Sequence, residues 1–222
     1  QPRAVFIDPD TLQTLPHREW VAGLAEVIKY GIIADDAFFS FLEESMSKIL
    51  KLDTDSVMHA IVRSCQIKAR VVAEDERESD RRRMLNYGHT IGHALESLGG
   101  YRGLIHGEAV GIGLVQEAEL AVHLGICGPS VPARIRALVQ IAGLSDRLPN
   151  TSFAALWKAM QHDKKVVGGQ VVGVWPVRIG EVVIRSLDKQ ACANWHRAVQ
   201  SAGPKGSRRR VRRVSRTRRQ KK

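Results

Sequence analysis

The spacing of apolar residues along the chain predicts a mostly α-helical protein. Apolar side chains recur at helical intervals in most segments, and glycine, proline or clustered polar residues separate these segments. A first helix is expected to begin near Pro16, because proline is favoured in the opening turn. The other predicted helices are residues 36–50, 56–73, 88–98, 108–123, 130–143 and 152–161.

Strand-like patterns are confined to the two ends of the chain. Residues 5–8, Val-Phe-Ile-Asp, form a short strand-like run that Pro9 closes. Towards the C-terminus, Gly168-Gly169 lies between Val-rich segments and is typical of a hairpin turn, with strands predicted at residues 171–177 and 181–184. Asp188 can cap a final short helix. The sequence has neither a GxGxxG fingerprint nor a P-loop.

Residues 85–113 carry three of the eight histidines and are the part of the chain around which the rest is organised. Each residue of an α-helix turns by about 100°. His89, His93 and Glu96, at positions i, i+4 and i+7, therefore share one stripe of the predicted helix. His106 follows a glycine-rich turn at the mouth of the next helix, so a hairpin of helices would bring it close to His89.

Neutral imidazoles and a carboxylate are the ligand set of catalytic zinc, which keeps a coordination position open for water or substrate. Glu26 is the best candidate for a third ligand, since it lies with Lys29 in an otherwise apolar helix. Each observation also has an ordinary explanation. The histidines can be surface or core residues, Glu26 and Lys29 can form a helix ion pair, and Glu108 can be a first-turn acid.

Composition limits the classes of protein that fit. The length allows one sizeable core or two small ones. Residues 205–222 hold eleven Lys and Arg and no acid, which equals the whole net charge of +11. The preceding residues are formally neutral, so the sequence predicts a domain over residues 1–200 and a basic, disordered tail over residues 201–222. Non-specific contact of this tail with nucleic acid is expected.

Two further charged features lie before the central stretch. Lys68 falls among apolar neighbours, which is uncommon for a lysine that is only solvated. Residues 74–83 form a dense block of charges that is either a solvated loop or a source of arginines for carboxylate or phosphate. Three scattered cysteines without a CxxC pair indicate no disulfide framework. The absence of a long apolar run or a signal-like segment makes a cytoplasmic protein the expectation, with no membrane partner.

Five motifs in order make the chain resemble the C-terminal metal- and substrate-binding domain of the 3-dehydroquinate synthase family, within the sugar-phosphate cyclases. The resemblance covers about residues 1–190 and rests on TLPHREWVAGLAEVIKYGII, SCQIKARVVAEDERES, LNYGHTIGHALE, HGEAVGIG and DKK followed by a strand pair ending at Ile179-Gly180. It implies a mostly helical domain with a small β-hairpin. The family's N-terminal dinucleotide-binding domain is expected to be absent here or carried by a separate chain.

The resemblance also implies a reaction and its cofactors. Members of this family are lyases of the shikimate pathway that cyclise 3-deoxy-D-arabino-heptulosonate 7-phosphate to 3-dehydroquinate, with elimination of phosphate. They use NAD, which here would bind mainly through the missing domain, and one divalent metal, zinc or cobalt. A homodimer is the expected assembly. Without its partner domain, this chain is expected to bind metal better than it catalyses.

The family's functional residues carry over onto matching positions of this sequence. The implied metal ligands are Glu26, His89 and His106, and the implied catalytic or substrate-contacting residues are Lys29, Lys68, Glu78, Arg82, Asn86, His93 and Lys164, the last within Asp163-Lys164-Lys165. Ser79-Asp80 stand where the family usually has a small, glycine-type residue. The basic tail is no part of the family pattern.

Two alternatives remain open from the sequence. A related sugar-phosphate cyclase or a metal-dependent alcohol dehydrogenase would keep the overall plan but alter the cations that bind substrate. A non-catalytic remnant whose tail binds nucleic acid is the second alternative, and only the tail favours it.

Overall fold

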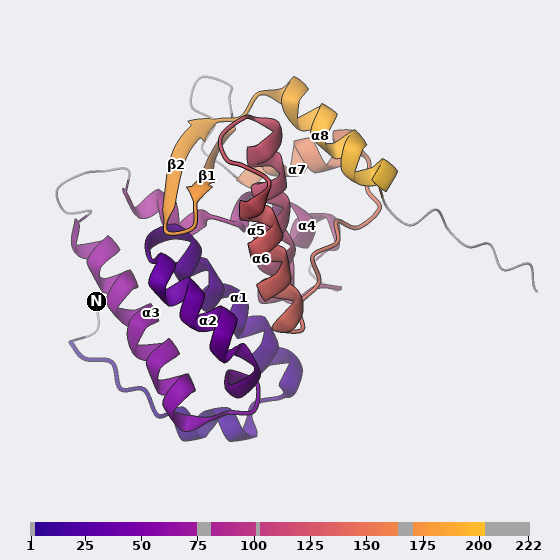
Figure 1. The fold of residues 1–222 in the computed structure, drawn as a ribbon. Helices are drawn as coiled ribbons and strands as arrows, with labels where there is room; N and C mark the ends of the chain where they lie inside the picture. Colours follow the sequence, from indigo (N-terminus) through magenta and orange to yellow (C-terminus); the bar gives the residue numbers. More distant parts are fainter. Residues whose placement is uncertain (1–2, 75–80, 101–102, 164–170, 203–222) are drawn as a thin grey trace, which may run out of the picture.

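A computed structural model of the 222-residue chain describes residues 3–74, 81–100, 103–163 and 171–202. The prediction of a mostly helical domain with one small hairpin is confirmed (Figure 1). In chain order the elements are the 3₁₀ helix η1 (Pro9–Thr14), α1 (His17–Ala34), α2 (Asp36–Ile49), α3 (Thr54–Glu74), the 3₁₀ helix η2 (Arg81–Asn86), α4 (His89–Leu98), α5 (His106–His123), α6 (Ser130–Ile141), α7 (Phe153–Asp163), β1 (Val172–Arg178), β2 (Glu181–Ser186) and α8 (Lys189–Ala202).

Helix α5 is the centre of the fold. It packs against α1, α4, α6, α8 and β1, and Figure 1 shows it running between the two ends of the molecule. Most of its residues are buried, and they lie on all sides of the helix rather than on one stripe. A helix that is apolar all round must be covered all round. The elements that surround α5 provide this cover.

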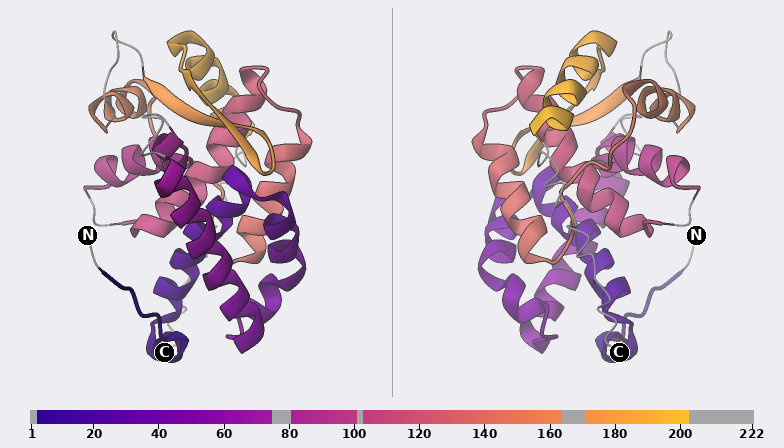
Figure 2. Two further views of the ribbon diagram at one scale, coloured as in Figure 1. Left: turned by 90° about the vertical axis from the view of Figure 1, so that its left-hand side faces the viewer. Right: turned by 90° about the vertical axis from the view of Figure 1, so that its right-hand side faces the viewer.

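Two clusters of buried apolar side chains lie on either side of α5. The first is drawn mainly from α1, α2, α3 and α6 and includes Ile28 and Phe39. The second is drawn from α4, α7, α8 and β1 and includes Trp175 and Trp195. Helix α5 contributes to both clusters. Both views in Figure 2 agree that α1 to α3 form one end, and that the hairpin, α7 and α8 form the other.

The two strands pair antiparallel, with Trp175 opposite Val183. They turn at Gly180, whose φ of 85° lies in the left-handed region that glycine adopts without strain. The backbone N–H of Gly180 donates to Ile32 O over 2.9 Å, which ties the hairpin to α1. The strands agree with the predicted ranges to within two residues. The predicted turn at Gly168-Gly169 lies outside the described residues.

Two local predictions were wrong. Residues 5–8 are not a strand, and Val5, Phe6 and Ile7 are exposed, because an extended segment becomes a strand only beside a partner and none of the described residues pairs with it. The last helix is not short, since α8 has 14 residues and ends at Ala202. Its buried Cys192 and Trp195 join the second cluster, and this packing holds several turns of α8 in place.

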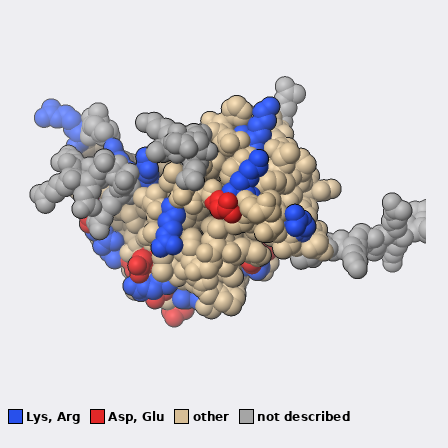
Figure 3. Space-filling view, turned by 90° about the horizontal axis from the view of Figure 1, so that it is seen from above, with Lys and Arg blue, Asp and Glu red and all other residues tan. Residues whose placement is uncertain are grey.

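One face of the molecule shows how the charged side chains of the described residues are distributed. Seen from the end that carries the hairpin and α8, Lys and Arg side chains are separated by wide areas of other residues (Figure 3). The described residues of this face therefore form no continuous basic patch. None of the helices that the structure describes is long and apolar enough to cross a membrane.

Candidate metal and substrate site

The first member of the site is Glu26, on the face of α1 that meets α4 and α5. Its Oε2 accepts a hydrogen bond of 2.5 Å from Lys29 Nζ, one helical turn later. Its Oε1 is buried and has no hydrogen-bond partner within the described part of the chain. A buried oxygen without a partner is costly. Glu26 Oε1 is therefore a position where a proton donor or a cation is needed.

His89 is the first residue of α4. Its Nδ1 lies 3.0 Å from Tyr87 O, and a carbonyl oxygen only accepts, so the ring hydrogen lies on Nδ1. The lone pair of the neutral ring is then on Nε2, which is 3.3 Å from Glu26 Oε1. Two electron-rich atoms at this distance repel each other unless a proton or a metal ion lies between them.

His106 is the first residue of α5 and completes the group. Its Nε2 lies 3.8 Å from Glu26 Oε1, and its Nδ1 lies 3.2 Å from a carboxylate oxygen of Glu96. The two imidazoles have ring centroids 5.3 Å apart. The predicted hairpin of helices does bring His89 and His106 together. The ligand atoms of Glu26, His89 and His106 all lie within 4.8 Å of one another.

These three residues fit a zinc-like ion. Zinc binds histidine nitrogen at about 2.0–2.1 Å, so neighbouring ligand atoms around one tetrahedral ion stand about 3.3 Å apart. The contacts of 3.3 and 3.8 Å at Glu26 Oε1 need only small adjustments to reach this spacing. A cation between the three groups would also satisfy the buried oxygen of Glu26.

The charges around Glu26 keep it a carboxylate. Burial raises the pKa of Glu26, but a proton shared with His89 and the charge and hydrogen bond of Lys29 outweigh this effect and lower the pKa to about 2. Burial lowers the pKa of Lys29, and the attraction of Glu26 offsets only part of the change. Glu26 is thus ready to bind a cation at neutral pH, with Lys29 holding its other oxygen.

Arg18 and Glu108 hold the start of α5 against α1. The Arg18 guanidinium donates two hydrogen bonds of 2.7 Å to the Glu108 carboxylate, which also accepts from the backbone N–H of Ile105. The arginine lowers the pKa of Glu108. Glu108 lies in the first turn of α5, as the sequence analysis expected of a first-turn acid. The contact fixes His106, two residues before Glu108, in reach of Glu26.

The buried Glu117 of α5, which the sequence analysis did not single out, caps α4. Its two carboxylate oxygens accept from the backbone N–H groups of Gly88 and Ile91 at 2.8 and 2.9 Å. The first N–H groups of a helix have no partner within the helix, and Gly88 has no side chain to cap them. The sequence does show an acidic residue within the apolar run of α5, which could have drawn attention to Glu117. Its partner across the hairpin could not be found from spacing.

We expect Glu117→Gln to lower the free energy of unfolding by about 2 kcal/mol, because a neutral amide accepts less strongly and turns an N–H₂ group towards one of the two N–H donors. Chemical denaturation measures this change. Glu119→Gln on the same helix is the matched control, since Glu119 forms a partly exposed ion pair with Arg136. An equal loss of stability in both variants would contradict the capping role.

The other predicted residues are distributed around this group. His93 lies one turn after His89 on α4, with ring centroids 5.1 Å from His89 and 5.8 Å from His106. Lys68 on α3 is exposed, contrary to its apolar sequence context, because Ile67 and Val71 face the core while Lys68 faces outward. Its charge nonetheless contributes to the lowered pKa of Lys29.

Arg82 and Asn86 lie on η2, which packs against α1 and α3, and both are exposed. Glu78 and Lys164 lie outside the described residues. So does the rest of the segment from residue 75 to residue 80, which is most of the charge block. The described structure thus brings together Glu26, Lys29, His89, His93 and His106, with η2 alongside. The arrangement can hold a metal ion and presents cationic side chains nearby.

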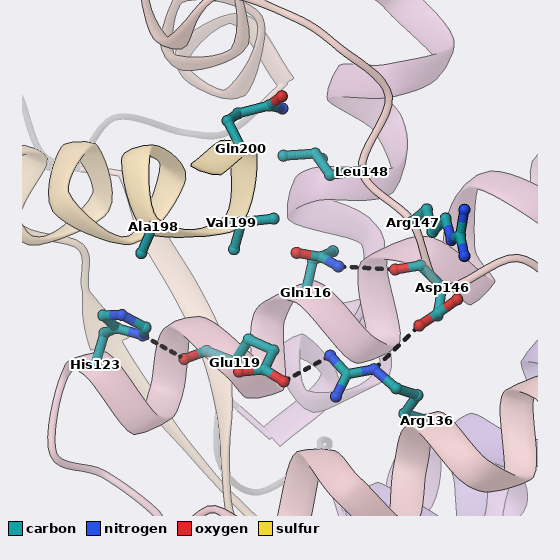
Figure 4. Close-up of a pocket in the computed structure, with 10 residues that line it drawn as sticks. All are labelled: Gln116, Glu119, His123, Arg136, Asp146, Arg147, Leu148, Ala198, Val199 and Gln200. Carbon is teal, nitrogen blue, oxygen red and sulfur yellow. Dashed lines mark hydrogen bonds and ion pairs between the residues drawn. The ribbon is translucent and has the colours of Figure 1, made fainter. Parts of the chain in front are cut away.

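A separate cavity of about 470 Å³ lies at the other half of α5 and is lined by parts of α5, α6 and α8 (Figure 4). Its most prominent feature is Arg136, which donates to Glu119 over 2.6 Å and to Asp146 over 3.0 Å. Gln116, which also lines the cavity, is ten residues after His106. At a rise of about 1.5 Å per residue the cavity is therefore about 15 Å from the histidines. Its paired charges hold α5, α6 and the following loop together.

Comparison of the sequence with known proteins identifies relatives for most of the chain. The family model for the C-terminal domain of 3-dehydroquinate synthase matches residues 23–166. The 3-dehydroquinate synthase of Citrifermentans bemidjiense is 51% identical over 166 residues, which are 75% of this chain and 46% of the relative. That of Thermodesulfovibrio yellowstonii is 50% identical over 185 residues, which are 83% of this chain and 52% of the relative. The chain spans about half the length of the curated relatives it matches.

Solved structures share the fold at low sequence identity. The 2-epi-5-epi-valiolone synthase of Streptomyces hygroscopicus, solved with NAD⁺ and Zn²⁺ bound, gives a TM-score of 0.78 at 23% identity and covers 88% of this chain and 55% of its own. A 2-deoxy-scyllo-inosose synthase complexed with carbaglucose-6-phosphate, NAD⁺ and Co²⁺ gives a TM-score of 0.62 at 19% identity. The match covers 89% of this chain and 57% of the synthase. Since the family model matches more than half of the chain, and relatives about half identical span three quarters or more of it, the chain belongs to the 3-dehydroquinate synthase family and matches its C-terminal domain.

Proposed function

We propose that this chain is the metal- and substrate-binding half of a 3-dehydroquinate synthase. Together with a dinucleotide-binding domain, NAD and one zinc or cobalt ion, it would convert 3-deoxy-D-arabino-heptulosonate 7-phosphate into 3-dehydroquinate and phosphate. The observation that carries the proposal is the convergence of Glu26 Oε1, left without a partner, on the Nε2 atoms of His89 and His106. The names of the relatives at about 50% identity support the same reaction.

In the proposed site Glu26, His89 and His106 hold the metal. When bound, a divalent metal polarises substrate hydroxyl oxygens and lowers the pKa of the one to be oxidised. Lys29 holds Oε2 of Glu26 and so fixes which oxygen faces the ion. His93, whose ring lies close to both metal-binding imidazoles, is positioned to hold a proton on a ring nitrogen beside the bound hydroxyl.

The surrounding cations and amide would bind the charged ends of the substrate. Lys68 and Arg82 suit the carboxylate and phosphate groups, since the Lys68 ammonium offers a positive point charge and the Arg82 guanidinium can donate two parallel hydrogen bonds. Asn86 can both donate to and accept from a substrate hydroxyl. Glu78 and Lys164 belong to the proposed site through the family motifs. Hydride transfer itself belongs to NAD, which we infer binds mainly through a separate dinucleotide-binding domain.

Two parts of the proposed assembly rest on the sequence alone. A homodimer follows from the resemblance, and the basic tail, which lies outside the described residues, is expected to contact nucleic acid only non-specifically. A related sugar-phosphate cyclase is the second candidate function, favoured by the fold it shares with the valiolone and inosose synthases. The much higher identity to 3-dehydroquinate synthases favours the first.

Complementation tests the proposed function. The chain is mixed with the N-terminal domain of the Thermodesulfovibrio yellowstonii relative, NAD and zinc, and phosphate release from 3-deoxy-D-arabino-heptulosonate 7-phosphate is followed. We expect release that requires all components, with 3-dehydroquinate as the product. Lys68→Met should lower the rate by at least about tenfold through loss of one charge-assisted contact. Lys48→Met, on the exposed surface of α2, is the matched control and should leave the rate unchanged.

The outcomes separate the candidates. Phosphate release from glucose 6-phosphate, whose carba analogue is bound in the inosose synthase structure, in place of the seven-carbon acid would favour the related cyclase. A mixture that binds zinc but releases phosphate from neither substrate would contradict the proposed activity.

A further inference from the structure

The contact between Glu96 and His106 has no role in the site as described so far. Glu96 lies on the stripe of α4 that carries His89 and His93, and its side chain is only 11% exposed. Its carboxylate oxygens lie 3.2 and 3.4 Å from Nδ1 of His106. Because either oxygen can accept from His106 Nδ1, the interaction is kept when the carboxylate rotates. It links the second turn of α4 to the first residue of α5.

This contact decides which nitrogen of His106 carries the hydrogen. A carboxylate only accepts, so His106 must donate from Nδ1, and the lone pair of the neutral ring is then on Nε2. Nε2 is the atom that faces Glu26 Oε1 at 3.8 Å. With the opposite tautomer, Nε2 would carry a hydrogen and could not bind a metal ion.

We propose that Glu96 is a positioning residue for the metal site, which holds the hydrogen on Nδ1 of His106 and so directs the Nε2 lone pair towards Glu26 and His89. The proposal rests on metal binding by Glu26, His89 and His106. Metal-binding histidines in proteins regularly donate their other ring N–H to a carboxylate or a carbonyl, which fixes the tautomer and the ring orientation.

His89 and His106 obtain this support in different ways. His89 donates from Nδ1 to the backbone oxygen of Tyr87, and its side chain is only 11% exposed, so packing also holds its ring. The side chain of His106 is 49% exposed. Packing holds the His106 ring far less, so its orientation depends on Glu96. Loss of Glu96 should therefore weaken metal binding through His106 alone.

The same contact selects between two possible sites. His93, Glu96 and His106 also place ligand atoms within 4.8 Å of one another, and this second group shares His106 with the first. A hydrogen on Nδ1 prevents that nitrogen from binding a metal ion beside Glu96. The interaction therefore favours one ion at Glu26, His89 and His106.

The test combines nitrogen-15 NMR of histidine tautomers with zinc affinity, both on the full 222-residue chain. Spectra of the metal-free protein at about pH 8, above the usual imidazole pKa of about 6.5, report which ring nitrogen of His106 carries hydrogen. Zinc affinity is measured by competition with a coloured chelator. The variants are Glu96→Ala and Glu96→Gln, and the matched control is Glu44→Ala, which removes an exposed carboxylate from α2.

We expect His106 of the unmodified chain to carry its hydrogen on Nδ1, and Glu96→Ala to shift it towards Nε2. The zinc dissociation constant should rise about 10- to 100-fold in Glu96→Ala. Glu96→Gln should keep the tautomer, because its amide oxygen still accepts, and should lose less affinity. Glu44→Ala should match the unmodified chain. If Glu96→Ala is too unstable to study, the unmodified chain carries the test, because a hydrogen on Nε2 of its His106 would contradict the proposal.

Two results would overturn the proposal. One is an unchanged tautomer and zinc affinity in Glu96→Ala. The other is two zinc ions per unmodified chain, one of which is lost with Glu96, because Glu96 would then be a ligand. If the unmodified chain binds no zinc, metal binding by this chain without its partner domain fails separately. The NMR measurement still decides whether Glu96 fixes the tautomer of His106.

Discussion

Zinc affinity is expected to fall roughly 100- to 1000-fold in each of the variants Glu26→Ala and His89→Ala, because a structural zinc ion contributes about 10–16 kcal/mol through four ligands and each variant removes one of them. His93 and Glu96 belong to a second group of possible ligand atoms, which shares only His106 with the first. Metal content per folded chain after dialysis, together with competition against a chelator, measures the loss.

His17→Ala is the matched control for this experiment. His17 is an exposed histidine at the start of α1, the helix that carries Glu26, and its loss should leave zinc affinity unchanged. Stoichiometric zinc retained by both Glu26→Ala and His89→Ala would show that the ion binds elsewhere. Zinc absent from the well-folded, unmodified chain would show that the site forms only with its partner domain.

A second large effect is expected from Gly113→Ala, which should lower the free energy of unfolding by at least about 3 kcal/mol through overpacking. A Cβ atom at position 113 would lie 1.9 Å from the backbone oxygen of Gly88. Backbone atoms cannot rotate away as a side chain can, so α4 and α5 would have to separate. Gly88 itself has a φ of 82° and opens α4, so the shift would also move His89.

Gly23→Ala is the matched control for Gly113→Ala, because Gly23 also lies within a helix but has no atom within 4 Å of its added Cβ. Alanine there should stabilise the chain by up to about 1 kcal/mol. Chemical denaturation compares the two variants, and zinc affinity of Gly113→Ala reports on His89. Equal stability of the two variants would contradict the close contact between the helices.

The features that could be predicted from the sequence are those that depend on the local spacing of residues. Helices were found because apolar residues recur at their period, and the stripe of His89, His93 and Glu96 followed from the same geometry. The structure also brings Glu26, His89 and His106 together as expected, while their role as metal ligands stays a prediction. Their ligand chemistry restricted the choice, and the glycine-rich turn indicated a hairpin of helices.

The contacts that join distant segments could not be found in this way. Glu117 caps a helix that begins 28 residues earlier, and its own neighbours in sequence give no sign of that partner. The bond between Glu96 and His106 depends on the angle between two helices, which periodicity does not specify. Residues 5–8 show the reverse case, since their local pattern suits a strand but no strand of the described residues lies beside them.

The close approach of α1 and α5 has a consequence for how this chain can vary. A Cβ atom at Gly107 would lie 2.0 Å from the backbone oxygen of Ala22, so glycine is what allows the two helices to touch. Glu26 lies one turn after Ala22, and His106 directly precedes Gly107. Substitution at this point would separate two of the proposed metal ligands and at the same time open the protein interior. The stability of the fold and the geometry of the proposed metal site therefore depend on the same close contact, so a substitution that changes one also changes the other.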